Sequence, residues 1–352
     1  MTGDVQSETS RAIGARVTYI SWAESCSRSD HTARELGGRS HMIYLPQFGS
    51  RPSTILFKYI GQWIQTSRVL RDERPDVVFV MTPPVFAALP AFWYAWRRGK
   101  HVVLDAHSAA FLHPRWRRFQ WLQRTLCRRS RTTLVHNQHL AEVVRRMDAH
   151  ATLVPYVPVV FESIEPFARP DSFTVGVVCS FNHDEPVVQI VDAARMLPDV
   201  RFFITGNPRY LPTELEAVLP ANVALTGFLS APAYGGLLST VDVVMSLTTR
   251  DHTMLRAAYE AIYQGTPVIV SDWPLLRDAF DEGAAHVDNT TAGIADAITR
   301  VRKDCAAFRE GARRLRERKL RRWAEIRAHI VKRVWPEAGQ AVIVDPREAE
   351  TG

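Results

Sequence analysis

The sequence predicts an α/β protein built from two doubly wound domains, in which helices cover both faces of a parallel sheet. Three observations support this prediction. The chain has 352 residues, which suggests two domains of ordinary size. Short runs rich in Val, Ile and Phe alternate with amphipathic stretches, and such runs are typical of strands buried on both faces of a sheet. The alternation occurs in both halves of the chain, so we expect two domains of similar design.

The first half is expected to contain six strands and five helices. Its strongest strand signal is the continuous apolar run VVFVM, which helical stretches bound on both sides. The expected strands cover residues 16–21, 41–45, 76–81, 101–105, 133–136 and 152–155. The expected helices lie near residues 30–37, 54–72, 84–98, 115–129 and 138–147.

The second half repeats this order of elements. In doubly wound sheets ligands bind beyond the carboxyl ends of the strands, so functional residues are expected in the loops that follow strands. The expected strands cover residues 173–179, 201–205, 223–226, 242–247, 267–271 and 285–287. The expected helices lie near residues 185–196, 213–218, 232–239, 254–264 and 291–303.

Charge is distributed in blocks along the chain. The formal net charge is +7, but residues 1–160 carry +11, residues 161–299 carry −11 and residues 300–333 carry +10. The change of sign, together with a cluster of prolines, predicts a domain boundary between residues 157 and 171. We expect a flexible tail at 1–14, domains at 15–160 and 161–299, a basic helical segment at 300–335 and a flexible tail at 336–352.

Composition excludes several classes of protein. Hydrophobic residues make up 46% and charged residues 23%, which is globular and excludes disordered, collagen-like and disulfide-scaffold chains. Four cysteines without a CxxC motif predict no zinc site and a reduced, cytoplasmic setting. The longest apolar stretch, residues 85–96, is interrupted by Pro90 and is too short to span a bilayer. The first residues lack the apolar core of a signal peptide. No nucleic-acid-binding module is recognisable, so no nucleic acid partner is expected.

The segment from residue 300 onward reads as a long, highly basic helix. Its apolar side chains are sparse and recur along one stripe: Phe308, Leu315, Trp323 and Ile330. We expect the helix to pack on the first domain through this stripe, while its arginines face water or lipid.

Two segments carry the strongest motif signal, NVALTGFLSAPAYGGLLSTVDVVMSL at 222–247 and AAYEAIYQGTPVIVSDWPLLRDAF at 257–280. They resemble the donor-sugar domain of GT-B glycosyltransferases, especially the group 1 family. The resemblance covers residues 173–290 and, less specifically, 16–160. It implies two Rossmann-like domains, with a nucleotide-sugar donor held by the C-terminal one and an acceptor by the N-terminal one. It also implies that no metal or other cofactor is needed, and the chain has no DxD-type motif at a strand end.

The resemblance assigns Glu260 to the ribose of the donor. Glu260 lies inside an apolar helix, where a carboxylate costs free energy unless it meets hydrogen-bond donors, and a ribose diol supplies two. The alternative is a salt bridge to Arg256, four residues earlier on the same helix face.

The loop before this helix departs from the family pattern. His252 stands where relatives have the first glutamate of a Glu-x7-Glu motif, close to the transferred sugar. Thr253 is expected to cap the helix, and Arg250 to reach the diphosphate at its start. The alternative for Arg250 is a surface ion pair with Asp251.

The loop after the first strand of the second domain reads SFNHDEP, at 180–186, without the cations that relatives often carry there. Ser180 and Asn182 are expected to bind phosphate oxygens together with the N–H groups that open the next helix. The two acidic residues of the loop alternatively cap that helix, with Pro186 in its first turn. Gly206 follows the next strand, where it would permit close approach of the backbone to the nucleotide.

On the acceptor side, Asp105 and His107 come directly after a buried strand, and alternation puts both on one side facing the expected interdomain cleft. Relatives place a His or Asp here, so either residue is a candidate catalytic base or sugar-positioning group. The alternative for Asp105 is a cap on the following turn. Arg28 and His31 lie in the first loop, 25–31, where relatives approach the acceptor or the diphosphate.

Residues 114–131 hold seven arginines interleaved with aromatic side chains. This composition suits an interfacial helix on an anionic membrane. The alternatives are an amphipathic helix whose aromatic residues belong to the core, and a polyanion-binding patch. The residues expected on this surface are Arg117, Arg118, Trp121 and Arg128.

Together these features predict a metal-independent GT-B glycosyltransferase of the hexosyltransferase type. It would move a hexose-like sugar from a nucleoside diphosphate to a glycan or lipid-linked acceptor at the inner membrane face, in cell-surface polysaccharide or glycolipid synthesis. The alternatives are a nucleotide-sugar epimerase of the same fold and a non-catalytic module that binds a glycan or a partner.

Overall fold

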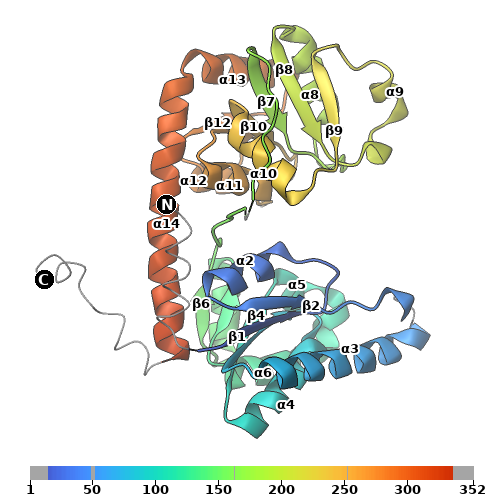
Figure 1. Cartoon of the computed structure of the whole chain (residues 1–352), viewed down its shortest axis with the longest axis vertical. Coiled ribbons are helices and arrows are strands. Elements are labelled where there is room, and N and C mark those ends of the chain that lie inside the picture. Colours follow the sequence, from blue (N-terminus) through green and yellow to red (C-terminus); the bar gives the residue numbers. More distant parts are fainter. Residues whose placement is uncertain (1–14, 49–51, 162, 252, 336–352) are drawn as a thin grey trace, which may run out of the picture. The chain divides into compact units, whose positions relative to one another are not determined.

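A computed structural model describes residues 15–48, 52–161, 163–251 and 253–335 (Figure 1). The chain forms two compact units, and the boundary between them falls after Val157. The first unit contains the chain up to Val157 together with the segment from Arg322 onward, and the second contains Pro158 to Arg321. The tails expected at 1–14 and 336–352 lie outside the described residues.

The first unit is built on a parallel sheet of six strands in the order β2-β1-β3-β4-β5-β6. Its chain order reverses at β1, whose neighbours are β2 and β3, so the point where ligands bind in doubly wound sheets lies at the carboxyl ends of these strands. The strands are β1 (Val17–Ser21), β2 (Arg39–Met42), β3 (Val77–Thr82), β4 (His101–Ala106), β5 (Thr133–Val135) and β6 (Ala151–Leu153).

Helices cover both faces of this sheet. The helices are α2 (Ser27–Glu35), α3 (Pro52–Glu73), α4 (Ala88–Arg98), α5 (Ser108–Leu112), α6 (Gln120–Arg129) and α7 (Gln138–Arg146). Short 3₁₀ turns are η1 (Pro46–Phe48), η2 (Val85–Ala87) and η3 (Pro114–Phe119).

Alternation along β3 explains how the two faces are filled. Phe79 packs with residues of α2 and with Trp323, whereas Val78 and Val80 pack with residues of α3, α4 and α6. Figure 1 shows α3, α4 and α6 together on one side of this sheet.

The second unit contains another parallel six-stranded sheet, in the order β12-β11-β10-β7-β8-β9. Its chain order reverses between β7 and β10, which pair directly. The strands are β7 (Phe173–Val177), β8 (Val200–Thr205), β9 (Val223–Gly227), β10 (Val243–Ser246), β11 (Val268–Ser271) and β12 (Ala284–Val287). The helices are α8 (Val187–Met196), η4 (Pro208–Tyr210), α9 (Thr213–Glu216), α10 (Ala231–Thr240), α11 (Arg256–Gln264), α12 (Pro274–Ala279) and α13 (Thr291–Lys303).

The long C-terminal helix α14 (Cys305–Val334) contributes to both units. The expected apolar stripe exists, but its two ends join different cores. Phe308 packs against the core of the second unit, whereas Trp323 and Ile330 are buried in the core of the first. The expected packing on the first domain is therefore confirmed for Trp323 and Ile330, whereas Phe308, at the other end of the stripe, packs on the second unit.

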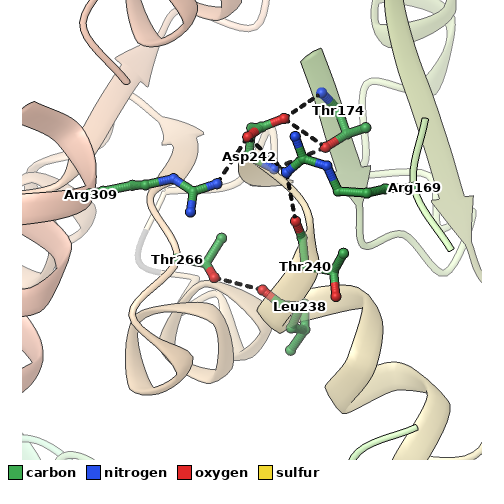
Figure 2. A network of polar contacts seen from close by, with 7 residues as sticks. All are labelled: Arg169, Thr174, Leu238, Thr240, Asp242, Thr266 and Arg309. Atoms are coloured by element: carbon green, nitrogen blue, oxygen red, sulfur yellow. Dashed lines mark hydrogen bonds and ion pairs between the residues drawn. The ribbon is translucent and has the colours of Figure 1, made fainter. Parts of the chain in front are cut away.

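A polar network ties α14 to the amino edge of the second sheet (Figure 2). Asp242, directly before β10, accepts hydrogen bonds of 2.9 Å from the backbone N–H and the hydroxyl of Thr174 in β7. Arg169 and Arg309 donate to its other carboxylate oxygen at 3.1 and 2.9 Å. The carboxylate thus holds the two strands at the chain reversal together, and Arg309 joins α14 to them.

Several predicted helix boundaries were wrong, two of them clearly so. The helix expected at 30–37 begins at Ser27, and the segment expected to be helical over 115–129 is a 3₁₀ turn followed by α6.

Within the described parts of the chain, none of the helices combines the length and the apolar character that crossing a bilayer requires.

Candidate functional site

Polar side chains gather at the carboxyl edge of the first sheet. Asp105 lies near the end of β4 and is buried, and Arg28 reaches it from the first turn of α2. Tyr19 Oη donates to Asp105 Oδ2 at 2.6 Å, and Arg28 Nε donates to the same oxygen at 2.9 Å. The side chain of Asp105 therefore holds α2 against the sheet, and the alternative that it caps the following turn is wrong.

The environment of Asp105 keeps its carboxylate ionised. Burial raises the pKa of Asp105, but the charges of Arg28 and His107 and the hydrogen bonds from Arg28 and Tyr19 outweigh burial, so the pKa lies below its ordinary value. Burial also raises the pKa of Tyr19 well above its ordinary value, which keeps that phenol protonated as a donor. A carboxylate with a lowered pKa and two donors on one oxygen is a weak proton acceptor. It is better suited to positioning than to general-base catalysis.

His107 has the properties of a proton acceptor that Asp105 lacks. It follows β4, and its backbone N–H donates to the carbonyl of Thr82 at the end of β3. Burial lowers the pKa of His107, as does the charge of Arg28, while Asp105 raises it. Its Nε2 atom is buried and, among the described residues, has no hydrogen-bond partner, and the same is true of the Thr82 hydroxyl. Buried polar atoms of this kind need an explanation, and a bound substrate hydroxyl supplies one.

His136, directly after β5, belongs to the same group and was not among the predicted site residues. Burial lowers its pKa, and the charges of Arg28 and His107 lower it further. The signal in the sequence was its position after a buried strand, but the expected strand 133–136 included it as a strand residue. Arg28 was predicted on the acceptor side, and the structure shows it bound to Asp105. His31 lies one turn further along α2.

In the second unit, two loops meet at the carboxyl ends of β7 and β10. The loop after β7 brings Asp184 to the loop after β10, where Thr248 Oγ1 donates to its carboxylate at 3.0 Å and Thr249 N–H donates to its carbonyl at 2.7 Å. Arg250 contacts Nε2 of His183. The Arg250 side chain therefore contacts a histidine of the loop after β7.

Glu185 binds the backbone amides of Ser180 and Asn182, the two loop residues that were expected to bind phosphate. Its carboxylate accepts hydrogen bonds from the N–H of Ser180 at 3.0 and 3.1 Å and from the N–H of Asn182 at 2.7 Å. The next helix begins at Val187, after Pro186, so the alternative that the acidic residues cap it is wrong. The loop binds an anion, and in this structure that anion is a side chain of the protein.

The backbone conformation and a close contact with the neighbouring loop require a glycine at position 206. Its φ is +115°, and a Cβ atom there would lie 2.3 Å from the carbonyl oxygen of Cys179 in the neighbouring loop. Any side chain would therefore push the loops after β7 and β8 apart.

The Glu260 carboxylate is held by two donors. Tyr234 Oη of α10 donates to Oε2 at 2.8 Å, and Arg256 Nε donates to Oε1 at 2.6 Å. The salt bridge to Arg256 that the sequence suggested is present, and the side chain of Glu260 is 5% exposed, against 64% for Arg256. Burial raises the pKa of Tyr234 well above its ordinary value, as does the charge of Glu260, so the phenol stays protonated.

The start of α11 differs from the prediction. The helix begins at Arg256 after Leu255, so Thr253 lies before its N-cap and does not cap it. His252 lies outside the described residues.

The basic segment after α5 divides its aromatic residues between core and surface. Trp116 and Phe119 are partly buried and pack against Phe86, as the core alternative predicted. Trp121, by contrast, is 67% exposed. Arg117, Arg118 and Arg128 are exposed as well.

The described residues contain no group of three or more His, Cys, Asp or Glu side chains placed to hold a metal ion. The donors that converge in both units are instead hydroxyl, phenol, imidazole, guanidinium and backbone N–H groups. These suit hydroxyl-rich and anionic ligands.

Both halves of the chain match sequence profiles of glycosyltransferase domains. The profile of the glycosyl transferase 4-like domain matches residues 7–159, and that of the glycosyl transferase-like family Glyco_trans_1_2 matches residues 186–331. A comparison with curated proteins gave no match.

Solved structures of similar fold span nearly the whole chain. Sucrose-phosphate synthase from Thermosynechococcus elongatus is 14% identical, with a TM-score of 0.62, over 90% of this chain and 97% of that one. Anabaena HepE, in complex with UDP and glucose, is 13% identical, with a TM-score of 0.60, over 90% and 98%. UDP-GlcNAc 2-epimerase from Neisseria meningitidis, bound to UDP-GlcNAc, is 14% identical, with a TM-score of 0.56, over 85% and 94%. With two parallel six-stranded sheets and both halves matched by glycosyltransferase profiles, the chain belongs to the GT-B glycosyltransferases of the group 1 family.

Proposed function

We propose that this glycosyltransferase moves a hexose-like sugar from a nucleoside diphosphate to a hydroxyl of a glycan or lipid-linked acceptor, with His107 as the catalytic base. The observation that carries the proposal is the imidazole Nε2 of His107, which is buried and without a hydrogen-bond partner among the described residues. Because burial lowers its pKa, the ring is neutral at neutral pH and can accept the proton of an attacking hydroxyl.

The other groups of the first unit orient this base. Asp105 stays ionised through Arg28 and Tyr19, and its negative charge stabilises the imidazolium that forms when His107 takes a proton. The Thr82 hydroxyl, at the end of the neighbouring strand, offers a further hydrogen-bonding group to the acceptor.

The second unit would hold the donor. Glu260 is proposed to bind the ribose diol, with the hydrogen bonds from Tyr234 and Arg256 orienting its carboxylate. Arg250, exposed in the loop after β10, would neutralise the diphosphate together with loop N–H groups. HepE and the epimerase were solved with UDP or UDP-sugars, so UDP-sugars are the first donors to test.

The proposal extends to setting and pathway. The four cysteines are all free thiols, which suits a reducing cytoplasm. A lipid-linked acceptor would place the enzyme at the inner membrane face, in cell-surface polysaccharide or glycolipid synthesis. No metal or other cofactor is proposed, because the donor's leaving diphosphate can be stabilised by Arg250 and backbone amides.

The test is nucleotide release from panels of UDP- and GDP-sugars with a membrane extract as acceptor source. The wild type is expected to release nucleotide from one donor, and His107→Ala to lower kcat without changing donor affinity. Glu260→Gln is expected to weaken donor binding. Nucleotide binding without release from any donor would make the chain a non-catalytic module. Formation of an epimeric sugar nucleotide without acceptor would make it an epimerase.

A further inference from the structure

Helix α3 exposes a row of large apolar side chains on the face opposite to the one that packs on the sheet. Leu70, on the packed face, is fully buried. The exposed residues recur at intervals of three and four, which places them along one stripe. They are Phe57, Ile60 and Ile64, 61%, 48% and 45% exposed, with Leu56 beside them at 63%. A continuous apolar stripe on the surface of a soluble unit indicates a binding surface.

The two neighbouring helices on the same side of the sheet continue this surface. α4 exposes Trp93 and Trp96, 51% and 75% exposed, and α6 exposes Trp121. All three helices lie on the same side of the first sheet (Figure 1), and they pack inward through one shared core. Indole rings, with an apolar body and one N–H, are favoured where a bilayer meets water.

The same elements are strongly cationic. Helices α3, α4 and α6 and the turn η3 contain eleven lysines and arginines, against two acidic residues, Asp72 and Glu73, at the very end of α3. Asp148, which pairs with Arg124 and Arg128 of α6, is a nearby countercharge. We call this surface, with its exposed apolar residues and its cations, the α3–α4–α6 face.

Two grooves beside the exposed indoles are lined by cations. A groove of about 200 Å³ is lined by Trp96 together with Lys100, Arg129 and Arg131. A wider one, of about 700 Å³, is lined by Trp121 together with Arg124, Arg128 and Arg146. In both, a tryptophan that can enter the headgroup region stands next to guanidinium groups that bind phosphate.

We propose that the α3–α4–α6 face binds an anionic phospholipid bilayer, with Phe57, Ile60 and Ile64 entering the acyl boundary and the arginines contacting lipid phosphates. Charge complementarity favours this occupant over a second copy of the chain, because two such faces placed against each other would bring like charges together. The surface gives the proposed enzyme access to a lipid-linked acceptor and to that extent rests on the proposed function, but lipid binding itself needs neither donor nor acceptor.

The apolar contribution is tested by co-sedimentation with vesicles of phosphatidylcholine, with or without phosphatidylglycerol. The wild type is expected to sediment with the anionic vesicles only. Replacing Phe57, Ile60 and Ile64 together with serine is expected to lower the partition coefficient at least about tenfold, since three apolar side chains no longer leave water. The matched control replaces three exposed apolar residues of the second unit with serine: Tyr210, Val218 and Phe228. The control is expected to bind like the wild type.

The charge contribution has its own matched pair of variants. Replacing Arg98, Arg117 and Arg118 with glutamine is expected to lower partitioning about 100-fold, and added salt to weaken wild-type binding. The control removes three exposed arginines of α14 and is expected to keep most of the binding. These are Arg313, Arg316 and Arg321.

Four outcomes would overturn the proposal. The first is vesicle binding by the serine variant that equals that of the wild type, and the second is a loss of binding in either control as large as in its matched variant. The third is wild-type binding to neutral vesicles that equals its binding to anionic ones. The fourth is a wild-type dimer in ultracentrifugation that the serine variant abolishes. Circular dichroism verifies that each variant is folded. The vesicle assay contains no sugar donor, so a protein that does not bind vesicles would leave the transferase proposal standing. Conversely, a protein that binds vesicles but transfers no sugar would leave the membrane-binding proposal standing.

Discussion

Arg28 Nε donates a hydrogen bond of 2.9 Å to Oδ2 of Asp105, a residue 77 positions further along the chain. The same guanidinium donates from Nη2 to the carbonyl of Val154 at 3.1 Å. One side chain of α2 thus joins the end of β4 to the segment after β6. Asp105 is 1% exposed and Arg28 21%, so the pair interacts in a medium where charges are weakly screened.

Asp105→Asn is expected to destabilise the first unit by about 2–4 kcal/mol, because it leaves a largely buried guanidinium without its countercharge. Chemical denaturation followed by circular dichroism measures the change. The matched control is Asp148→Asn, which removes an exposed carboxylate that also pairs with arginines, and its cost is expected to be much smaller because water screens that pair. Equal effects of the two variants would contradict a buried, structurally important pair.

The same pair predicts a pH dependence. The pKa of Asp105 in the folded protein is lower than its ordinary value, so its stabilising contribution is present above the ordinary pKa and is lost as the pH falls through the lowered one. The stability difference between wild type and Asp105→Asn should therefore be constant near neutral pH and shrink only below about pH 4. A difference that shrank between pH 6 and 8 would point to another group, such as His107.

His107→Ala is expected to lower kcat about 10²- to 10⁴-fold, the usual contribution of a general base, with little change in donor affinity. Because burial lowers the pKa of His107 from 6.5, the acid limb of the wild-type kcat profile should lie below pH 6.5 and be absent in the variant. His139→Ala, at an exposed position of α7, is the control and should keep wild-type kinetics. An unchanged acid limb in His107→Ala would remove His107 as the base.

The fold could be predicted because burial on both faces of a parallel sheet leaves a direct mark on the sequence. The run VVFVM at 77–81 in β3 is apolar at every position and is buried at every position. Helix ends were less predictable. Thr253 has the chemistry of an N-cap, yet α11 begins three residues later, at Arg256. Local capping preference is weaker than the tertiary contacts that decide where a helix starts.

The candidate site could be predicted only where a polar residue follows a strand. Asp105 and His107 were found in this way. Tyr19 was not, because an aromatic side chain in a buried strand is typical of a core, and only the fold shows its hydroxyl meeting Asp105. The exposed stripe of α3 was missed for a related reason: apolar residues in a helix suggest burial until the sheet shows which face is covered.

Asp242→Asn is expected to lower the stability of the second unit by about 2–3 kcal/mol (Figure 2). The amide cannot satisfy both arginines and the two donors of Thr174, and two charge-assisted hydrogen bonds are lost. Asp199→Asn removes an exposed carboxylate paired with Arg302 in the same unit, and its cost should be much smaller because water screens that pair. Thermal unfolding measures both. A wild-type melting temperature in Asp242→Asn would show that the network adds nothing to stability.

Glu185→Gln is expected to tighten UDP binding about fivefold. The Glu185 carboxylate accepts hydrogen bonds from the loop amides of Ser180 and Asn182, so a diphosphate that uses them must displace it against like-charge repulsion. Glutamine keeps the shape, binds the amides less strongly and removes a repulsion of about 1 kcal/mol. Titration calorimetry with UDP measures the change, and Glu214→Gln, an exposed carboxylate of α9, controls for net charge. Unchanged or weaker affinity in Glu185→Gln would mean that the diphosphate binds elsewhere, with Glu185 serving only to shape the loop.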